Sequence, residues 1–527
     1  MPPRKSYLGM RAASERSLTA GEAGSRDAAR GTSPARRVQW LYGLAAWALP
    51  LVLYVRTMAP TVYGVDSADL TTSAFLLGIA HPPGAPAYLL VGHAFAALPI
   101  GDVGYRLNLL SAVAGALASF FLYCAVRRLS GDAWLALATA WLVAVSYFVW
   151  TAAVAAELYA PQGCVVAALI ALVLRWREAG QPWLFGLLCL LAGLGLGVHL
   201  SLALMLPGLA LLALAPPLRS APRPALLLAG ASCGLIGAAV YVYLPLRFLA
   251  DLPLNPARDY WQVDLATWRG FWWMISGAGF RREIFGVTAA ALPAELAVFA
   301  YRLWSNFLGL PALLGVLGLV DGLRRRVWIH LGLLLMLLGH VTFYLFYGAP
   351  DKQVMFLPAY LIWGVWIGLG ARVAAGWAGR RLGLGEAPSL APAALACVAA
   401  LLLLVNYGWA DVSRDWSARR RGEAILQQLE PNAIFIGAWP DLRLVEYLQQ
   451  VEGARPDIEP VDVFFAAPAE RAQRIGAALQ SHRPVYVAIC EDLPDAVQCE
   501  YRAGCDCYQL NPLPAGNPPV PQPQPQP

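Results

Sequence analysis

The densest group of residues that could do chemistry follows the first apolar run of the chain and begins with Asp66 and Asp69. Three positions separate the two acids, so on a helical turn both carboxylates project to the same side. One carboxylate can then accept the proton of a hydroxyl group while its neighbour orients or tunes it, which is general-base chemistry. The same spacing suits Asp66 as the N-cap of the helix that follows, and spacing alone leaves both interpretations open.

A rigid turn and a third acid accompany this pair. The turn, His81-Pro82-Pro83-Gly84, separates two apolar segments that are each too short to span a bilayer, and we expect them to lie along the membrane face. Glu157 stands at the start of a later apolar run, and an acid at membrane depth is a functional candidate by default.

The composition indicates that membrane helices position these residues. Of the 527 residues, 58% are hydrophobic and 14% are charged, against roughly 25% charged in soluble domains. The formal net charge is +6, but the positive residues are scattered between apolar runs, so nucleic acid is not an expected partner. Eleven runs are near the length that a bilayer requires, and they cover residues 38–57, 106–126, 132–151, 158–174, 182–198, 200–216, 224–245, 296–319, 327–347, 355–374 and 389–408.

Arginine clusters between these runs predict the orientation of the chain. Residues 1–37 contain no apolar run and are rich in arginine, so we expect a disordered cytoplasmic tail. With this tail inside, the positive-inside rule is obeyed at every turn by the clusters at Arg127/Arg128, Arg175/Arg177, Arg219/Arg223, Arg324 to Arg326 and Arg372/Arg380/Arg381. The loops 58–105 and 247–295 and everything after residue 408 then lie outside the cytoplasm. The aromatic stretch that begins at Trp268 is expected to anchor the second loop in the interface, with stacking on a sugar as the alternative.

The C-terminal part is predicted to be a small extracytoplasmic α/β domain over 409–512, followed by a disordered Pro/Gln-rich tail over 513–527. Its helix-like and strand-like signals alternate as in a βαβαβ unit, without a Gly-rich phosphate loop. Four cysteines here, Cys490, Cys499, Cys505 and Cys507, are expected to form at least one disulfide. The shortest closure joins Cys499 to Cys505 or Cys507, and a zinc site is the weaker interpretation.

Several of these segments are similar to a known family. Residues 66–70 (DSADL), 77–84 (LGIAHPPG) and 106–112 (RLNLLSA) resemble the signature of the domain-of-unknown-function 2723 family. That family includes the transmembrane protein 260 type protein O-mannosyltransferases, which are polytopic glycosyltransferases of the GT-C architecture. The likeness covers most of residues 40–375 and continues through residues 157–159, 195–199, 244–247 and 356–360. Where this chain has Asp69, the family usually has glutamate.

The resemblance implies a GT-C-like membrane domain over 38–408 that moves a hexose, mannose foremost, from a polyprenyl phosphate to a hydroxyl acceptor outside the cytoplasm. The expected acceptor is a Ser or Thr of a protein, and the base would be Asp66 or Asp69. The leaving phosphate requires positive charge or hydrogen-bond donors. The residues expected to bind donor or acceptor are His81, Arg106, Asn108, Glu157, Tyr159, His199, Arg247 and Lys352, with Arg247 ranked first. Each cation among them would equally suit contact with lipid headgroups.

No cofactor is expected. A divalent metal is not expected because a lipid monophosphate does not require one, and the alternative is that Asp66 and Asp69 together bind such an ion. The expected partners are the donor lipid, a protein or glycan acceptor, and membrane lipids, in a bacterial cell membrane or the endoplasmic reticulum. Three alternatives stay open. The acceptor is a lipid or a glycan, the chain is a transporter or flippase of lipid-linked sugars, or it is a scaffold whose C-terminal domain binds a partner. The transporter alternative is disfavoured because the acids are expected at one face of the membrane and not near its midplane.

Overall fold

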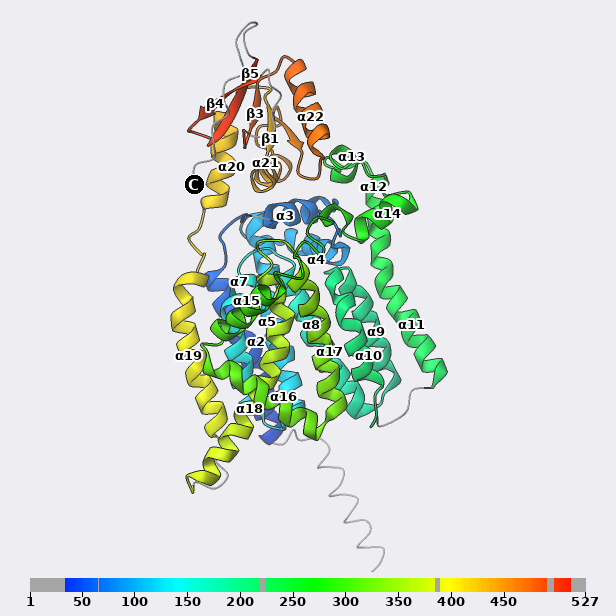
Figure 1. Cartoon of the computed structure of the whole chain (residues 1–527), viewed down its shortest axis with the longest axis vertical. Helices are drawn as coiled ribbons and strands as arrows, with labels where there is room; N and C mark the ends of the chain where they lie inside the picture. Colours follow the sequence, from blue (N-terminus) through cyan, green and yellow to red (C-terminus); the bar gives the residue numbers. More distant parts are fainter. Residues whose placement is uncertain (1–33, 65, 219–222, 384–388, 491–496, 513–527) are drawn as a thin grey trace, which may run out of the picture.

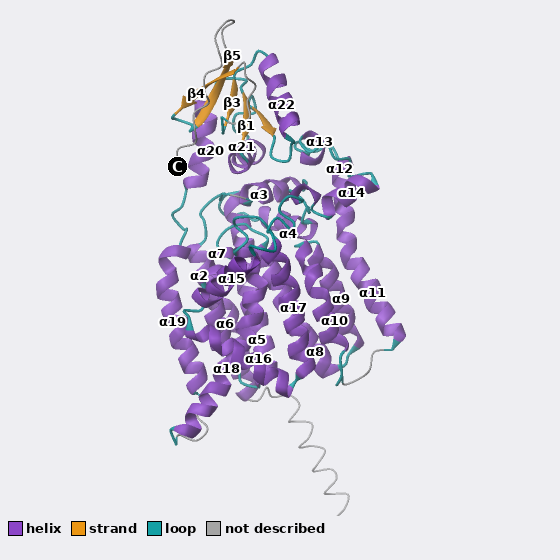
Figure 2. Ribbon diagram, viewed as in Figure 1, coloured by secondary structure: helices purple, strands orange, loops and turns teal. Residues whose placement is uncertain are grey.

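The computed structural model describes residues 34–64, 66–218, 223–383, 389–490 and 497–512. Figure 1 shows a bundle of upright helices with a small α/β domain at one end. Figure 2 shows that the strands belong to that domain. Of the predicted terminal tails, residues 1–33 and 513–527 lie outside the described residues, whereas residues 34–37 already belong to the first helix.

The helices of the bundle and of its loops, with 3-10 helices written η, are α2 Pro34–Thr57, α3 Ser67–Leu76, α4 Pro86–Ala96, α5 Val103–Ser130, α6 Ala133–Ala144, α7 Tyr147–Ala152, α8 Tyr159–Ala179, α9 Pro182–Leu196, η1 Leu200–Met205, α10 Leu206–Leu214, α11 Pro224–Ala238, η2 Ala239–Val242, α12 Tyr243–Leu249, α13 Pro256–Asp259, α14 Trp268–Ile275, η3 Ala278–Phe280, α15 Leu292–Asn306, α16 Leu310–Arg325, α17 Val327–Phe346, η4 Val354–Phe356, α18 Leu357–Arg381 and α19 Leu390–Ala410. The α/β domain contains α20 Ser417–Gln428, β1 Ile434–Gly437, α21 Trp439–Glu452, β2 Glu459–Asp462, α22 Pro468–Gln480, β3 Val485–Val487, β4 Val497–Arg502 and β5 Cys507–Pro512.

The chain is a multi-pass membrane protein. Each of the eleven predicted runs is helical, but among the described residues six helices are both long and apolar enough to cross a bilayer. The α15 and α16 helices would make a seventh span, but they meet at 105°. The run predicted as a span over 296–319 is therefore divided between two helices, and whether it crosses the bilayer stays a prediction. Leu308 and Gly309 adopt positive φ values of 54° and 83° between the two helices, which turns the chain.

Capping residues define both ends of α5, the helix that follows the first connecting segment. Asp102 caps α5, because its carboxylate accepts a hydrogen bond of 2.7 Å from the Tyr105 amide. Gly131 ends the same helix in the left-handed region with φ of 75°. The segment between α2 and α5 ends at the Asp102 cap and lies at this end of the bundle. There it forms α3 and α4, which lie between the bundle and the α/β domain (Figure 1).

The second connecting segment, between α12 and α15, carries the aromatic stretch predicted to anchor it in the interface. Trp268 and Trp272 of α14 stack on each other and are 75% and 56% exposed, whereas Met274 is buried in a small apolar core beneath them. An exposed pair of indoles on one helix face is consistent with anchoring at a membrane surface.

The α/β domain is built on a five-stranded sheet in the order β2-β1-β3-β5-β4. Strand β1 pairs in parallel with β2 and β3, which gives the βαβαβ arrangement expected from the sequence. Strands β5 and β4 extend the sheet as an antiparallel hairpin that sequence analysis missed. The reason is that β4 has no buried position, so it lacks the apolar alternation that signals a strand. Helix α21 packs against α3 of the bundle.

All four cysteines of this domain are joined in disulfides, but not as expected. Cys490 pairs with Cys499, and Cys505 pairs with Cys507. The closure predicted from Cys499 to Cys505 or Cys507 is wrong, because the hairpin register places Cys499 opposite Leu510 and Cys507 opposite Arg502. The pairing follows from strand register, which spacing along the chain does not reveal.

Peptide mapping of the protein without reduction should therefore recover a Cys490–Cys499 crosslink and no Cys499–Cys507 crosslink. Thiol labelling of the denatured, unreduced protein should modify only the five cysteines that carry no disulfide, which are Cys124, Cys164, Cys189, Cys233 and Cys397. Labelling of Cys490 or Cys499 before reductant is added would contradict the pairing.

Candidate active site

The two acids at the start of α3 lie on either side of one imidazole ring. The His81 Nδ1 atom is 2.7 Å from Asp69 Oδ2, and the His81 Nε2 atom is 3.7 Å from Asp66 Oδ2. The His81 amide also donates to Asp69 Oδ2 at 3.1 Å. Asp66 occupies the N-cap position of α3, but its side chain makes no capping hydrogen bond. The carboxylate of Asp66 is thus held for contacts other than capping.

The two acids differ in burial, and this difference indicates different roles for them. The Asp69 side chain is 3% exposed, whereas the Asp66 side chain is 27% exposed. Burial would raise the pKa of Asp69, but the hydrogen bond and charge of His81 outweigh it and hold the pKa below its usual value. Burial would lower the pKa of His81, but Asp66 and Asp69 outweigh it and raise the pKa to about 9. Asp69 can therefore anchor a protonated His81, and Asp66 remains accessible.

The α/β domain contributes a side chain to this group. The Trp439 Nε1–H at the start of α21 donates to Asp66 Oδ1 at 2.9 Å. The Trp439 ring also meets the His81 ring edge-on, with centroids 5.6 Å apart. Phe464 and Phe465 pack against the other sides of Trp439, and Phe465 contacts Phe280 of the second connecting segment. An aromatic wall from two distant parts of the chain thus covers the acid pair.

A buried arginine fixes the position of this wall. Arg443, one turn after Trp439 on α21, is ion-paired with Glu446 at 2.6 Å and with Asp462 of β2. Its guanidinium lies 4.4 Å from the centre of the Trp439 ring. Tyr260 of the second connecting segment donates to Glu446 at 2.6 Å and completes the cluster. Because the Arg443 side chain is fully buried, it positions α21 and cannot reach a substrate.

Three further groups, Glu157, Tyr159 and Asp351, feel the charge of Asp66, and His199 lies beside Tyr159. Burial, with the charges of Asp66 and Asp351, raises the pKa of Glu157 well above its usual value. Burial and Asp66 also raise the pKa of Asp351. Burial lowers the pKa of His199 to about 3, so this residue is neutral, and its ring lies 6.1 Å from that of Tyr159. The His199 Nδ1 atom accepts from the Ser201 amide, which leaves the ring proton on Nε2 as a donor.

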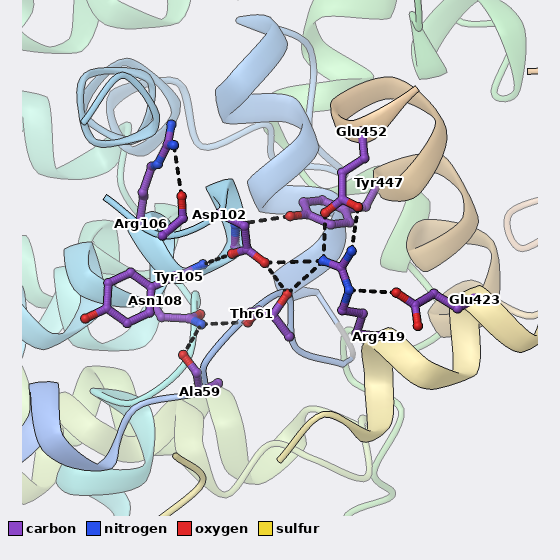
Figure 3. A network of polar contacts seen from close by, with 12 residues as sticks. Ala59, Thr61, Asp102, Tyr105, Arg106, Asn108, Arg419, Glu423, Tyr447 and Glu452 are labelled. Atoms are coloured by element: carbon purple, nitrogen blue, oxygen red, sulfur yellow. Dashed lines mark hydrogen bonds and ion pairs between the residues drawn. The ribbon is translucent and has the colours of Figure 1, made fainter. Parts of the chain in front are cut away.

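Two of the predicted binding residues are instead used to hold the loop between α2 and α5, as Figure 3 shows. The Arg106 guanidinium donates to the carbonyls of Ile100, Ala96 and Gly101. The amide of Asn108 is fully buried, donates to the carbonyls of Ala59 and Thr61, and accepts from the Ala156 amide. Asn108 thereby fixes the residue before Glu157. Neither side chain is brought to the acid pair.

Figure 3 also shows how the α/β domain is fastened to this loop. Arg419 of α20 forms ion pairs with Glu423 and Glu452 of its own domain at 2.7 Å each, and with Asp102, the cap of α5, at 3.3 Å. Tyr447 of α21 accepts a hydrogen bond from the Gly104 amide. The domain therefore contacts the segment between α2 and α5 both at this joint and where Trp439 of α21 meets Asp66.

The remaining two cations also have partners. Arg247, the first choice for the phosphate, donates from Nε to the Leu77 carbonyl at 2.5 Å and from Nη2 to the Leu76 carbonyl. It therefore completes the C-terminal end of α3 and stays partly exposed beside it. The Lys352 Nζ atom is 2.9 Å from Glu295 and donates to the Tyr347 carbonyl. Lys352 is buried, and its charge is matched by Glu295. Among the described residues no group of three or more His, Cys, Asp or Glu side chains is arranged to hold a metal ion.

Comparison with known proteins bears on this site. Residues 66–219 match the family described as the protein O-mannosyl-transferase TMEM260 N-terminal domain. The chain is 35% identical over 152 residues to the protein O-mannosyl-transferase TMEM260 of Mus musculus, which is 29% of this chain and 22% of the mouse protein. It is 28% identical over 122 residues to that of Dictyostelium discoideum, which is 23% of this chain and 15% of that protein. The matches thus span about a fifth or less of these relatives.

Solved structures give the fold of nearly the whole chain. ArnT from Cupriavidus metallidurans in the apo state superposes with a TM-score of 0.53 at 12% identity, over 90% of this chain and 98% of ArnT. The same protein bound to undecaprenyl phosphate gives a TM-score of 0.51 at 14% identity, over 91% and 98%. The chain has the GT-C fold. The fold class predicted from the sequence is thereby confirmed, while the number of spans and the role of the α/β domain are not decided by this likeness.

Trp439, Arg443 and Asp351 were missed by sequence analysis. Local spacing has no signal for Trp439, because 373 positions separate it from the acid whose carboxylate it contacts. Arg443 and Asp351 stand in segments that the sequence offers as an ordinary amphipathic helix and a short loop. Arg443 joins the site because α21 packs on α3, and Asp351 joins it because the charge of Asp66 acts on its carboxyl group.

The stability of the protein should fall as the pH rises through about 9. The carboxylates favour protonated His81 in the folded protein, so this stabilisation is fully present below its unfolded pKa of 6.5 and is lost as His81 deprotonates near pH 9. The shift is equivalent to about 3 kcal/mol. Melting temperatures of the wild type and of His81→Asn between pH 6 and 10 measure it. Parallel curves for the two proteins would contradict the assignment, because other groups would then cause the fall.

Proposed function

We propose that the chain is a membrane glycosyltransferase that moves a hexose, with mannose as first choice, from a polyprenyl phosphate to a hydroxyl group, with a Ser or Thr of a protein as the acceptor. The observation that carries this proposal is the pair of carboxylates held on either side of His81, inside the segment similar to the TMEM260 N-terminal domain. The names of the relatives support the sugar and the acceptor. The undecaprenyl phosphate bound to ArnT supports the class of donor.

In the proposed reaction Asp66 is the base. It accepts the proton of the acceptor hydroxyl while that oxygen attacks the anomeric carbon, and the bond from this carbon to the phosphate oxygen breaks with inversion. The departing phosphate keeps the electron pair and needs donors nearby. We propose protonated His81, neutral His199 and the raised-pKa carboxyl of Glu157 as these donors. Arg247 is a further candidate, because it stays partly exposed at the end of α3.

We further propose that the end of the bundle with the α/β domain faces away from the cytoplasm. Arg128, Arg177, Arg325 and Arg326 from three separate connections gather around one cavity, which lies at the ends of α5, α8 and α16. Gathering of the inter-helix arginines at one end is what the positive-inside rule requires of the cytoplasmic side. Helix α3, which begins at the acid pair, lies at the other end of the bundle, next to the α/β domain (Figure 1). A reporter that is active only outside the cytoplasm, fused after residue 410, should therefore be active.

The direct test is sugar transfer by the purified full chain in vesicles. A polyprenyl-phosphate mannose donor and a Ser/Thr-containing peptide should give a mannosylated peptide, identified by mass spectrometry, and a polyprenyl-phosphate glucose donor measures the preference for the sugar. Transfer to a lipid or glycan alone would replace the protein acceptor. Movement of the donor lipid across the vesicle membrane without any sugar transfer would favour the flippase alternative and contradict the enzyme assignment.

Replacement of Trp439 by phenylalanine should lower the turnover of this reaction roughly tenfold with little change in donor affinity. The variant keeps an aromatic ring but removes the N–H that orients the Asp66 carboxylate, and a hydrogen bond to a charged group contributes about 1.5–3 kcal/mol. Turnover and KM for the donor are measured separately. Trp268→Phe on the exposed face of α14 is the matched control and should leave turnover unchanged. Equal losses in both variants would rule out the positioning role of Trp439.

A further inference from the structure

A cavity of about 560 Å³ lies at the end of the bundle opposite the acid pair. It is formed where α5, α8 and α16 end, where α10 runs into Pro216 and Pro217, and where α17 begins. A smaller cavity of about 300 Å³ adjoins it and shares Arg128 and Glu178 with it. Neither cavity is used by the proposed sugar transfer, so both are available for another ligand.

The charge of the lining is strongly positive. The larger cavity contains one acid, Glu178, against four arginines, and the smaller one adds two more, so the full set of cations is Arg127, Arg128, Arg175, Arg177, Arg325 and Arg326. Some of this charge is already matched within the protein. Arg325 is paired with Asp321 at 2.8 Å, and Arg128 lies 3.4 Å from Glu178. Arg177 donates to the carbonyls at the end of α10.

Arg326 differs from these neighbours. Within the part of the chain that the structure describes, its guanidinium has no hydrogen-bond or ion-pair partner, although it lines the cavity directly before α17. The positive end of the α17 helix dipole begins at the next residue, Val327, and adds to the attraction for an anion. The cavity therefore offers an unmatched guanidinium in a positive field.

The apolar part of the lining indicates where such an anion comes from. Leu129, Leu174 and Ile329 are apolar residues of the lining, and they are buried or half-buried. Val327 and Trp328 stand at the rim and are 46% and 39% exposed on the outside of a membrane bundle. A free phosphate ion gains nothing from an apolar wall, whereas a phospholipid brings acyl chains to lie against it. A tryptophan beside arginines is also the pairing typical of the headgroup region.

We propose that this cavity binds the phosphate headgroup of an anionic phospholipid, with Arg326 and Arg128 as the principal donors to the phosphate and Trp328 beside the glycerol and upper acyl region. The site is independent of the proposed sugar transfer. The cavity is lined by the ends of α5 and α8, and α5 also packs against α3, the helix that carries Asp69, so an occupied site would hold the bundle together at the end away from the chemistry.

The test measures lipid retained by the full chain after purification from vesicles of phosphatidylcholine with a minor fraction of phosphatidylglycerol, by native mass spectrometry. The wild type should retain phosphatidylglycerol, and Arg326→Gln and Arg128→Gln should each reduce its retention by roughly tenfold, because each removes one charge-assisted contact to the phosphate. Arg324→Gln is the matched control. It removes the same charge from the same helix end, is exposed, and lines neither cavity.

The outcomes separate a built site from general surface charge. Retention in Arg324→Gln should equal that of the wild type, and a loss as large as that of Arg326→Gln would overturn the proposal in favour of non-specific attraction. Added millimolar inorganic phosphate should leave the lipid bound. Displacement of phosphatidylglycerol by phosphate would make the site one for a free anion and would also overturn it. Arg326 is exposed and unpaired among the described residues, so its replacement tests the site without disturbing the fold, which gel filtration verifies.

Discussion

Replacement of Asp66 by asparagine should reduce the turnover of sugar transfer by roughly 10² to 10⁴ fold. Asparagine keeps the size of the side chain and can still accept the hydrogen bond from Trp439, but it cannot accept a proton. Because Asp66 is the more exposed of the two acids, its loss should not unfold the protein, and affinity for the polyprenyl donor should change little. Single-turnover transfer in vesicles, with donor binding measured separately, distinguishes the two effects.

Asp69→Asn is the informative comparison for that experiment. Asp69 is buried and holds the ring and the amide of His81, so its replacement should lower turnover less and also lower the melting temperature. A greater loss of turnover in Asp69→Asn with unchanged stability would make Asp69 the base. Normal transfer by both variants would place the base elsewhere, and Glu157 would be the next candidate.

Replacement of Arg443 by methionine should cost about 3–5 kcal/mol in stability of the α/β domain. Methionine fills much of the same volume, but Glu446 and Asp462 would be left as buried acids without their counter-charge. The cluster also sets the position of Trp439, so the variant should lose transfer activity even at temperatures where the bundle remains folded. Denaturant or thermal unfolding followed by a probe in the α/β domain measures the stability, and transfer in vesicles measures the activity.

A compensating variant shows whether the unpaired acids cause this loss. Addition of Glu446→Gln and Asp462→Asn to Arg443→Met removes the uncompensated charges and should restore most of the stability. Arg421→Met is the control for an arginine in the same domain, because Arg421 is only partly buried and pairs with Asp441, and it should cost about 1 kcal/mol or less. An effect of Arg421→Met as large as that of Arg443→Met would contradict the special role of the buried cluster.

The parts of the fold that the sequence predicted are those with strong local signals. The helices α5, α8, α17 and α19 follow from apolar runs of bilayer length, and the parallel strands β1 and β3 follow from short apolar stretches. The local signals failed where an apolar run has the length of one span but contains two helices. The break at Leu308 and Gly309 lies inside one apolar run, and hydropathy does not distinguish a straight helix from two helices at 105°.

The candidate site was predicted only in the part that is contiguous in the sequence. Asp66, Asp69 and His81 lie within sixteen positions and meet through one short helix and one turn. Arg106 was expected to bind a substrate, but its guanidinium donates hydrogen bonds to three carbonyls of its own loop. Only the three-dimensional structure distinguishes these two uses of an arginine. Trp439 and Arg443 reach the site through the docking of a whole domain, which no spacing within one chain segment predicts.

The hydrogen bond between Trp439 and Asp66 also sets the order in which the protein can become competent during synthesis. The two residues are 373 positions apart, and at roughly 5–20 residues per second the ribosome reaches Trp439 about 20 to 75 s after Asp66. During that interval the acids are already translated while the wall that covers them does not yet exist. We therefore expect the nascent chain to lack the proposed transfer activity until the α/β domain folds. Ribosome-bound chains stalled before residue 439 should show no transfer, and chains released at full length should gain it.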